Sequence, residues 1–334
     1  MRKDEMGQEK NVGILGLGKY LPEKVLTNAD LEKMVDTSDE WITTRTGVKE
    51  RRIAAKGEAA SDMAVKAAKS ALNNAGLKAE DIDLVIVATI TPDMFFPSTA
   101  CQVQYKLGVD NIPAFDISVA CSGYIYGLTI ADQFIKTGMY RRALIIATEK
   151  LSAITDWEDR STCVLFGDGA GAAVLGVVEE GGILGAHLGA DGSKGDLLQL
   201  PAGGSRLPAS RKTVEDRLHT IKMEGNVLFK HAVKIMAEAA LAVTEPLGLK
   251  GDDIDIIIPH QANIRILYAL AKRMGVDPEK KVYLNIKKYG NMSAASSAVA
   301  LTEAVEEGRI KKGDTILMDA FGGGLTWGAL VIKW

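Results

Sequence analysis

Two nearly identical stretches decide the fold of this chain: GLKAEDIDLVIV at residues 76–87 and GLKGDDIDIIIP at residues 248–259, 172 positions later. Each follows a helical stretch rich in small residues, AVKAAKSALNNA in the first case and AVKIMAEAALAVTEP in the second. Similarity at a fixed spacing is evidence of a repeated structural unit. The sequence therefore predicts two consecutive copies of a β-α-β pattern, an N-terminal half at residues 12–178 and a C-terminal half at residues 179–334.

The predicted strands are continuous apolar runs, such as DLVIVATI, RALIIAT and DTILMDA. Strands without polar alternation are typical of sheets that are covered by helices on both faces, so we expect an α/β fold. VLFGDGAGAAVL, residues 164–175, differs because a Gly-Asp-Gly triplet separates two short apolar runs. It predicts a hairpin with Asp168 as a turn residue rather than a catalytic acid.

Composition excludes several classes of protein. A chain of 334 residues with 47% hydrophobic and 25% charged residues can bury a large core. The net charge of −3 argues against a general nucleic-acid binder, which would be basic. No apolar run approaches the ~18 residues of a membrane span, and we predict no membrane association. Residues 1–11, MRKDEMGQEKN, are expected to be a polar lead-in rather than a secretion signal.

The three cysteines, Cys101, Cys121 and Cys163, have no paired spacing and no C-x-x-C motif. They predict neither a disulfide framework nor a zinc site, and they indicate a reducing cytoplasm. Cys121 stands apart because small residues surround it in SVACSGY, just before an apolar stretch that predicts a helix ending at Gly138. A helix N-terminus lowers the pKa of a thiol and activates it as a nucleophile. The alternative is a core cysteine in a tightly packed helix start.

The repeat relates Cys121 to Asn291 in YGNMSAASS, 170 positions later. His260 directly follows the repeated strand of the second half. Because sites in open α/β sheets collect at the carboxyl ends of strands, we expect the three side chains to converge on one cavity. AFGGGLTWG, residues 320–328, follows the last repeated strand. Its glycines would let backbone N–H groups approach a ligand oxygen, or simply allow close helix packing.

ACSGY, PHQAN, GNMSAAS and AFGGGLTWG, in this order, resemble the motifs of β-ketoacyl-acyl-carrier-protein synthase III, the condensing enzyme that starts bacterial fatty-acid synthesis. The resemblance runs from about residue 12 to the C-terminus. It implies a thiolase-like fold, in which two pseudo-symmetric halves form five layers (α-β-α-β-α). It also implies a cytoplasmic homodimer that needs no metal or other cofactor.

The resemblance also implies roles for the motif residues. Cys121 would take an acyl group from acyl-CoA, and malonyl-acyl-carrier protein would then lose CO2. His260 and Asn291 would stabilise the resulting enolate, while backbone N–H groups of Cys121 and Gly324 would form the oxyanion hole for the condensation step. Nucleotide cofactors are not expected, since GILGLG at residues 13–18 lacks the dinucleotide-binding spacing.

Further positions match the binding sites of the family. Phe96 corresponds to an aromatic residue that reaches the acyl pocket of the partner subunit. Gln261 and Arg265 are expected to dock the carrier protein. The expected CoA-binding residues are Trp41, Arg45, Arg160, Gly225, Asn226, Phe229 and Asn263.

Three other functions are open to the sequence. The chain order Cys, His, Asn also occurs in papain-like peptidases, although their C-G-S-C-W signature is missing here. A non-catalytic scaffold that binds acyl-CoA or carrier protein is a second alternative. An acyl-CoA-primed ketide synthase of a secondary pathway is the third. Motif spacing does not determine whether the starter is an acetyl, branched or longer acyl group.

Overall fold

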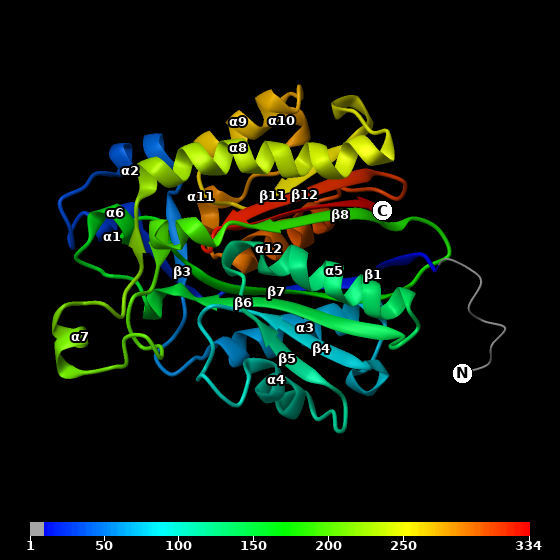
Figure 1. The fold of residues 1–334 in the computed structure, drawn as a ribbon, viewed down its shortest axis with the longest axis horizontal. Helices are drawn as coiled ribbons and strands as arrows, with labels where there is room; N and C mark the ends of the chain where they lie inside the picture. Colours follow the sequence, from blue (N-terminus) through cyan, green and yellow to red (C-terminus); the bar gives the residue numbers. More distant parts are fainter. Residues whose placement is uncertain (1–9) are drawn as a thin grey trace.

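The computed structural model describes residues 10–334 and contains two stacked β-sheets with helices around and between them (Figure 1). Most of the predicted polar lead-in lies outside the described residues. Strands of the first sheet run in the order β1 (Val12–Tyr20), β7 (Asp168–Val177), β6 (Arg142–Lys150), β4 (Leu84–Ala88) and β5 (Ala114–Ile117). The second sheet has the order β8 (Gly182–Ala190), β13 (Thr326–Lys333), β12 (Thr315–Gly322) and β11 (Ile256–Pro259).

The two sheets have equivalent strand pairings. β4 pairs in parallel with β6, and β11 pairs in parallel with β12, whereas the next two pairings in each sheet are antiparallel. The edge strand β5 has no full counterpart, but Val282 forms an isolated parallel bridge with Ile257 at the equivalent edge. The repeated sequence therefore folds into two related units.

Helices complete five layers. Figure 1 shows α5 (Gly123–Lys136) and α12 (Ala294–Glu306) between the two sheets. The outer face of the first sheet is covered by α3 (Ala60–Ala75) and α4 (Thr99–Leu107). The outer face of the second sheet is covered by α8 (Gly225–Thr244) and α9 (Ile264–Arg273). The expected α-β-α-β-α arrangement of the thiolase-like fold is confirmed.

The small residues of the middle layer explain how it fits between two sheets. Every residue of α12 from Ala294 to Ala304 is buried. A Cβ atom on Gly171 of β7 would lie 2.5 Å from the Ala298 side chain, far below a normal contact. Close approach of helix and strand thus requires glycine on β7 and alanine on α12.

The predicted hairpin at residues 164–175 is wrong. Asp168 is the first residue of the single long strand β7, and its buried carboxylate accepts hydrogen bonds from Ala54 N and from the amide and hydroxyl of Ser152 at 2.6–2.9 Å. The flanking glycines pack against neighbouring side chains instead of forming a turn, with Met292 beside Gly169. Asp168 therefore joins three segments and has neither of the roles considered for it.

Smaller elements gather mainly at the end of the molecule that lies beyond the carboxyl ends of β11 and β12 (Figure 1). No helix within residues 10–334 has the length and apolar character needed to cross a bilayer. The remaining strands are β2 (Lys24–Thr27), β3 (Glu50–Ile53), β9 (Leu198–Gln199) and β10 (Lys222–Met223). The remaining α-helices are α1 (Asn28–Leu31), α2 (Asp39–Thr46), α6 (Arg160–Cys163), α7 (Arg211–Glu215), α10 (Pro278–Lys281) and α11 (Ile286–Tyr289).

Candidate active site

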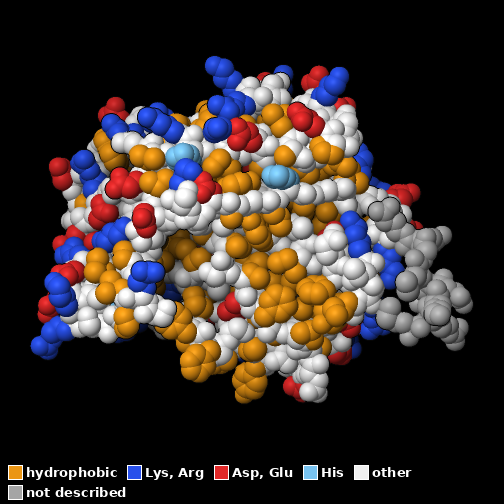
Figure 2. All heavy atoms as spheres, viewed as in Figure 1, with side chains coloured by type: hydrophobic (Ala, Val, Ile, Leu, Met, Phe, Trp, Pro, Cys, Tyr) orange, Lys and Arg blue, Asp and Glu red, His pale blue; other side chains and the backbone are white. Residues whose placement is uncertain are grey.

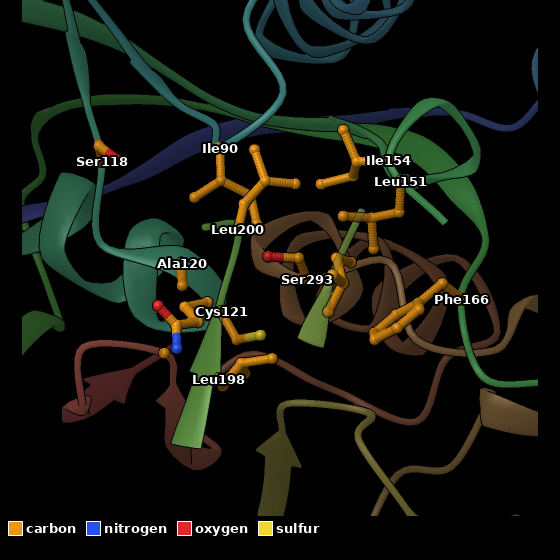
Figure 3. A pocket seen from close by; sticks show the side chains of 13 residues that line it. Ile90, Ser118, Ala120, Cys121, Leu151, Ile154, Phe166, Leu198, Leu200 and Ser293 are labelled. Atoms are coloured by element: carbon orange, nitrogen blue, oxygen red, sulfur yellow. The ribbon is translucent and has the colours of Figure 1, made fainter. Parts of the chain in front are cut away.

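Cys121 lies in a short 3-10 turn, Ala120–Ser122, that joins β5 to α5. Its side chain borders a cavity of about 250 Å³. In Figure 3 the Cys121 sulfur and the Ser293 hydroxyl both point into this cavity. Most of the surrounding side chains are apolar, namely Ile90, Leu151, Ile154, Phe166, Leu198, Leu200 and Ile221. A thiol in such a site is shielded from water but remains accessible to a ligand.

The second half contributes the opposite wall of this site. Gly322, the last residue of β12, packs directly on the cysteine: a Cβ atom there would lie 2.6 Å from Cys121 N. His260 N donates a 2.7 Å hydrogen bond to the carbonyl of Asp319 on the same strand. The structure thus brings His260 and Cys121 to the carboxyl end of β12, although they come from different halves.

Backbone hydrogen bonds hold Asn291 beside Phe166, a residue that lines the cavity. The Asn291 N–H donates to Leu165 O at 2.8 Å, and its carbonyl accepts from Gly167 N at 3.0 Å, so it bonds to the residues on either side of Phe166. The side-chain oxygen accepts from Ser293 N at 2.8 Å. Among the described residues the side-chain nitrogen has no acceptor, which leaves its N–H groups available to a ligand.

Burial controls the charge of the two titratable groups. It raises the pKa of the Cys121 thiol to about 12; the Ser293 hydroxyl lowers that pKa in part, and the Glu149 carboxylate adds to the rise. Burial likewise lowers the pKa of His260 to about 3. The prediction that the helix lowers the thiol pKa is wrong, because desolvation outweighs the helix end. Both groups are neutral near pH 7, so attack by the thiol requires a proton acceptor.

For the oxyanion hole the cavity favours Gly323 over the predicted Gly324. Gly323, not Gly324, lines the cavity together with Cys121. Gly322 touches the cysteine backbone, so the glycine run reaches the site through its first two members. The glycine nearest the cavity could not be chosen from sequence, since three consecutive glycines are equivalent in the motif.

Four of the predicted CoA-binding residues form one cluster. The guanidinium groups of Arg45 and Arg160 each lie 4.9 Å from the centre of the Trp41 ring. The Asn263 side chain donates to Arg45 O at 2.9 Å. An indole flanked by two partly exposed cations suits a ligand that combines a planar ring with phosphates.

The other predicted CoA-binding residues lie at the start of α8. Gly225 and Asn226 are exposed there, and the Phe229 ring has the Arg265 guanidinium 5.2 Å from its centre. This contact links the predicted CoA surface to the exposed residue expected to dock the carrier protein.

Gln261 does not fit its predicted docking role, because its side chain is fully buried. The amide donates to the carbonyls of Pro259 and Tyr283 at 3.0 and 3.1 Å, and the oxygen accepts from Asn285 N and Ile286 N, both at 3.1 Å. These four hydrogen bonds fix the segment that follows β11, and His260 belongs to this segment.

Phe96 lies outside the cavity and is 85% exposed in the single chain. Sequence reasoning missed Ser293, which lines the cavity together with Cys121, and Glu149, whose buried carboxylate adds to the rise in the thiol pKa. Ser293 follows Asn291 within a motif already recognised, and Glu149 is the only acidic residue in the apolar run RALIIATE. Only the second signal, an acid at the end of a buried strand, was available without the family motif.

Comparisons with known proteins agree with this geometry. The family model "3-Oxoacyl-[acyl-carrier-protein (ACP)] synthase III" matches residues 115–192 of this chain. The family model for the C-terminal part of the same enzymes matches residues 245–334. The β-ketoacyl-[acyl-carrier-protein] synthase III of Caldanaerobacter subterraneus subsp. tengcongensis is 65% identical, over 96% of this chain and 97% of the relative.

Solved structures show the same likeness. The crystal structure of 3-oxoacyl-[acyl-carrier-protein] synthase III from Aquifex aeolicus VF5 has a TM-score of 0.90 at 53% identity, covering 97% of this chain and all (100%) of that one. The priming β-ketosynthase of the R1128 polyketide pathway also has a TM-score of 0.90, but only 36% identity, with 97% of each chain covered. The matched motifs, the five layers and this identity over nearly the whole length together show that the chain belongs to the 3-oxoacyl-[acyl-carrier-protein] synthase III family of condensing enzymes.

Proposed function

We propose that the protein is an initiating condensing enzyme of type II fatty-acid synthesis. An acyl group passes from acyl-CoA to Cys121, and decarboxylative condensation with malonyl-acyl-carrier protein then yields 3-oxoacyl-carrier protein, CoA and CO2. The observation that carries this proposal is a buried thiol in an apolar cavity walled by both halves, where Gly322 of β12 packs on Cys121 and His260 is hydrogen-bonded to Asp319 of the same strand. Identity is 65% to a β-ketoacyl-[acyl-carrier-protein] synthase III but 36% to the R1128 priming enzyme, which favours this function over a secondary ketide pathway.

In the first half-reaction the Cys121 sulfur attacks the thioester carbonyl of acyl-CoA, and the CoA sulfur leaves. Covalent transfer of this kind divides one difficult reaction into two easier steps. Backbone N–H groups of Cys121 and Gly323 are suited to hold the tetrahedral oxyanion, since both residues border the cavity. The apolar lining then accommodates the bound acyl chain.

In the second half-reaction the malonyl group loses CO2 and leaves an enolate. The side chains of His260 and Asn291 supply N–H donors for its oxygen. A neutral imidazole donates from one nitrogen only, and the low pKa of His260 keeps it in this form. Preorganised donors of this type are worth ~3–4 kcal/mol each in a water-excluded site. The carbanion attacks the acyl-Cys121 thioester, and this scheme includes no metal or redox cofactor.

Labelling tests this function directly. After incubation with radiolabelled acetyl-CoA, label is expected on the peptide that contains Cys121, and added malonyl-acyl-carrier protein should remove it as CO2 is released. A peptidase or a binding scaffold would acquire no label. If acetyl-CoA fails, a panel of branched and longer acyl-CoAs must be tried, since the preferred starter is open. No labelling with any member would refute the proposal.

Arg265 is the exposed cation we propose for carrier-protein docking. Carrier proteins of the acidic kind are attracted by such a charge, which acts mainly on association. Arg265→Glu should raise KM for malonyl-acyl-carrier protein about tenfold, on the order of the 1.4 kcal/mol that one interfacial charge supplies. Acylation by acyl-CoA should be unchanged.

The matched control is Lys312→Glu, which reverses an exposed charge paired with Glu180. Lys312 precedes β12, whereas the cavity lies at the far end of that strand. The control should leave both half-reactions at wild-type rates. Equal losses in acylation and condensation for Arg265→Glu would contradict a docking role.

We further propose a homodimer and a cytoplasmic location. Figure 2 shows apolar side chains gathered on the lower part of this face, around α5, β5 and α4. Phe95, Phe96 and Tyr105, which lie just before and on α4, are at least 80% exposed in the single chain. A second subunit would cover them and bring Phe96 to its acyl pocket; sedimentation measurements test this. Three unpaired cysteines favour the cytoplasm.

A further inference from the structure

Glu303 is a buried carboxylate near the C-terminal end of α12, the helix between the two sheets (Figure 1), and the scheme above does not use it. Its Oε2 atom accepts a 2.9 Å hydrogen bond from the Asn285 side chain, and its Oε1 atom accepts a 2.6 Å bond from the Tyr289 hydroxyl. Both donors are themselves buried. Burial of a carboxylate costs free energy unless it is hydrogen-bonded, and here the bonds link α12 to a segment from each side of α11.

Asn285 connects Glu303 to the segment that carries His260. Its backbone N–H donates to the Gln261 side-chain oxygen at 3.1 Å, and the Gln261 amide donates to the Pro259 carbonyl at 3.0 Å. Pro259 and Gln261 are the residues on either side of His260. A chain of hydrogen bonds thus runs from the carboxylate, through Asn285 and Gln261, to the backbone that flanks the imidazole.

Tyr289 connects the same carboxylate to Asn291. Only Gly290, with a positive φ of 64°, separates the two residues. A Cβ atom on Gly290 would lie 2.6 Å from the carbonyl oxygen of Leu165, which also accepts the hydrogen bond from Asn291 N. This close packing leaves the link little room to move by itself. A shift of Tyr289 would therefore be passed on to Asn291.

Neighbouring groups favour this arrangement. The Lys19 ammonium on β1 lies 3.8 Å from Glu303 Oε1 and also pairs with Glu306, so it compensates part of the negative charge. Burial, together with the hydrogen bond to Glu303, raises the pKa of the Tyr289 hydroxyl, which therefore remains a donor near pH 7. Both oxygens of the carboxylate have fixed partners.

We propose that Glu303 positions His260 and Asn291 together, as the common hydrogen-bond acceptor that holds the segments of both enolate donors. The two donors must converge on one oxygen although they lie 31 residues apart in the chain, and α12 gives both a rigid base. Glu303 acts through Asn285 and Tyr289 and is a positioning residue. The inference rests on the proposed function, because it assigns Glu303 to the decarboxylation step.

The first test compares the two half-reactions in Glu303→Leu, which keeps much of the side-chain volume but offers no acceptor. Acylation of Cys121, followed by intact mass, should be unchanged. The maximal rate of labelled CO2 release from malonyl-acyl-carrier protein, expressed per acylated enzyme, should fall about tenfold to a hundredfold. The half-saturating concentration of malonyl-acyl-carrier protein should stay the same, since misplaced donors affect the transition state rather than substrate binding.

The conservative variant Glu303→Gln should restore the rate. Its oxygen can accept from Asn285, and the Tyr289 hydroxyl can turn to accept from the new amide. CO2 release should lie within about threefold of the wild-type rate, because the lost charge pairs only with the partly exposed Lys19 and Lys19 still has Glu306. A Glu303→Gln enzyme as slow as Glu303→Leu would overturn the role of a hydrogen-bond acceptor.

A double variant separates positioning from general stabilisation of the fold. Tyr289→Phe removes only a hydroxyl and should slow CO2 release about tenfold. In an Asn291→Ala background the same change should slow it by less than about threefold, because the donor that Tyr289 positions is already absent. A second tenfold loss would show that Tyr289 acts independently of Asn291 and would overturn the proposal. This pair serves as the test if Glu303→Leu does not fold.

The matched control is Thr302→Val on the same helix. Thr302 is 1% exposed, and its hydroxyl donates within α12 to Ala298 O at 2.8 Å. The control should keep both half-reactions at wild-type rates. Equal losses of acylation and CO2 release in Glu303→Leu, or wild-type CO2 release in that variant, would each contradict the positioning role. Failure of the wild-type protein to release CO2 at all would refute the proposed function instead.

Discussion

Replacement of Cys121 by serine is expected to abolish acyl-enzyme formation and, with it, condensation. A hydroxyl is a much weaker acid than a thiol, and burial that already raises the pKa of the thiol to about 12 would penalise an alkoxide still more. Serine is close in size to cysteine, so the packing against Gly322 should survive. We expect the rate of acyl transfer to fall by at least about a thousandfold, as for other enzymes that lose the nucleophile.

Intact mass spectrometry after exposure to acyl-CoA measures the effect, since each acylation adds the mass of one acyl group. Cys101→Ser is the matched control, because Cys101 is an exposed cysteine on α4 outside the cavity. It should acylate like the wild-type protein. A Cys121→Ser enzyme that forms a normal amount of acyl-enzyme would place the nucleophile elsewhere and would refute the proposed chemistry.

His260→Ala and Asn291→Ala should separate the two half-reactions. Each variant should still acylate at Cys121, because the scheme gives His260 and Asn291 a role only in decarboxylation and condensation. Each should lose the decarboxylation of malonyl-acyl-carrier protein, with a fall of about 100- to 1,000-fold for one missing enolate donor. In the double variant the rate need not fall by the product of the two single-variant factors, since the effects of residues that act on one oxygen are not additive.

Release of labelled CO2 from malonyl-acyl-carrier protein, measured on pre-acylated enzyme, checks this expectation. His219→Ala is a suitable control, because the His219 ring is hydrogen-bonded to Thr213 on α7, whereas His260 follows β11. If Asn291→Ala condensed at nearly the wild-type rate, its assigned role would be wrong. If His260→Ala failed to acylate, the imidazole would also act in the first half-reaction, contrary to the scheme.

Much of the fold could be predicted from the chain itself. The repeat at residues 76–87 and 248–259 reports the duplication directly, because both copies must fold into the same β-α-β unit. Continuous apolar strands indicated helices on both faces. The hairpin expected at residues 164–175 was wrong, since glycine serves both turns and close packing and only the neighbouring helix shows which applies. Cys121, His260 and Asn291 were found because strand ends and motifs are local signals.

Tertiary structure alone decided the properties that depend on distant neighbours. Burial of Cys121 by both halves reverses the pKa shift that its place before a helix predicts. The Gln261 side chain is buried because the segment from Tyr283 to Asn285 packs on it and forms hydrogen bonds with it. Ser293 and Cys121, 172 residues apart in the chain, line one cavity. The sequence determines which ionisable groups are present. Their pKa values depend on burial and on the charges nearby, and residues from all parts of the folded chain contribute to both, so the protonation states are decided only by the packed structure.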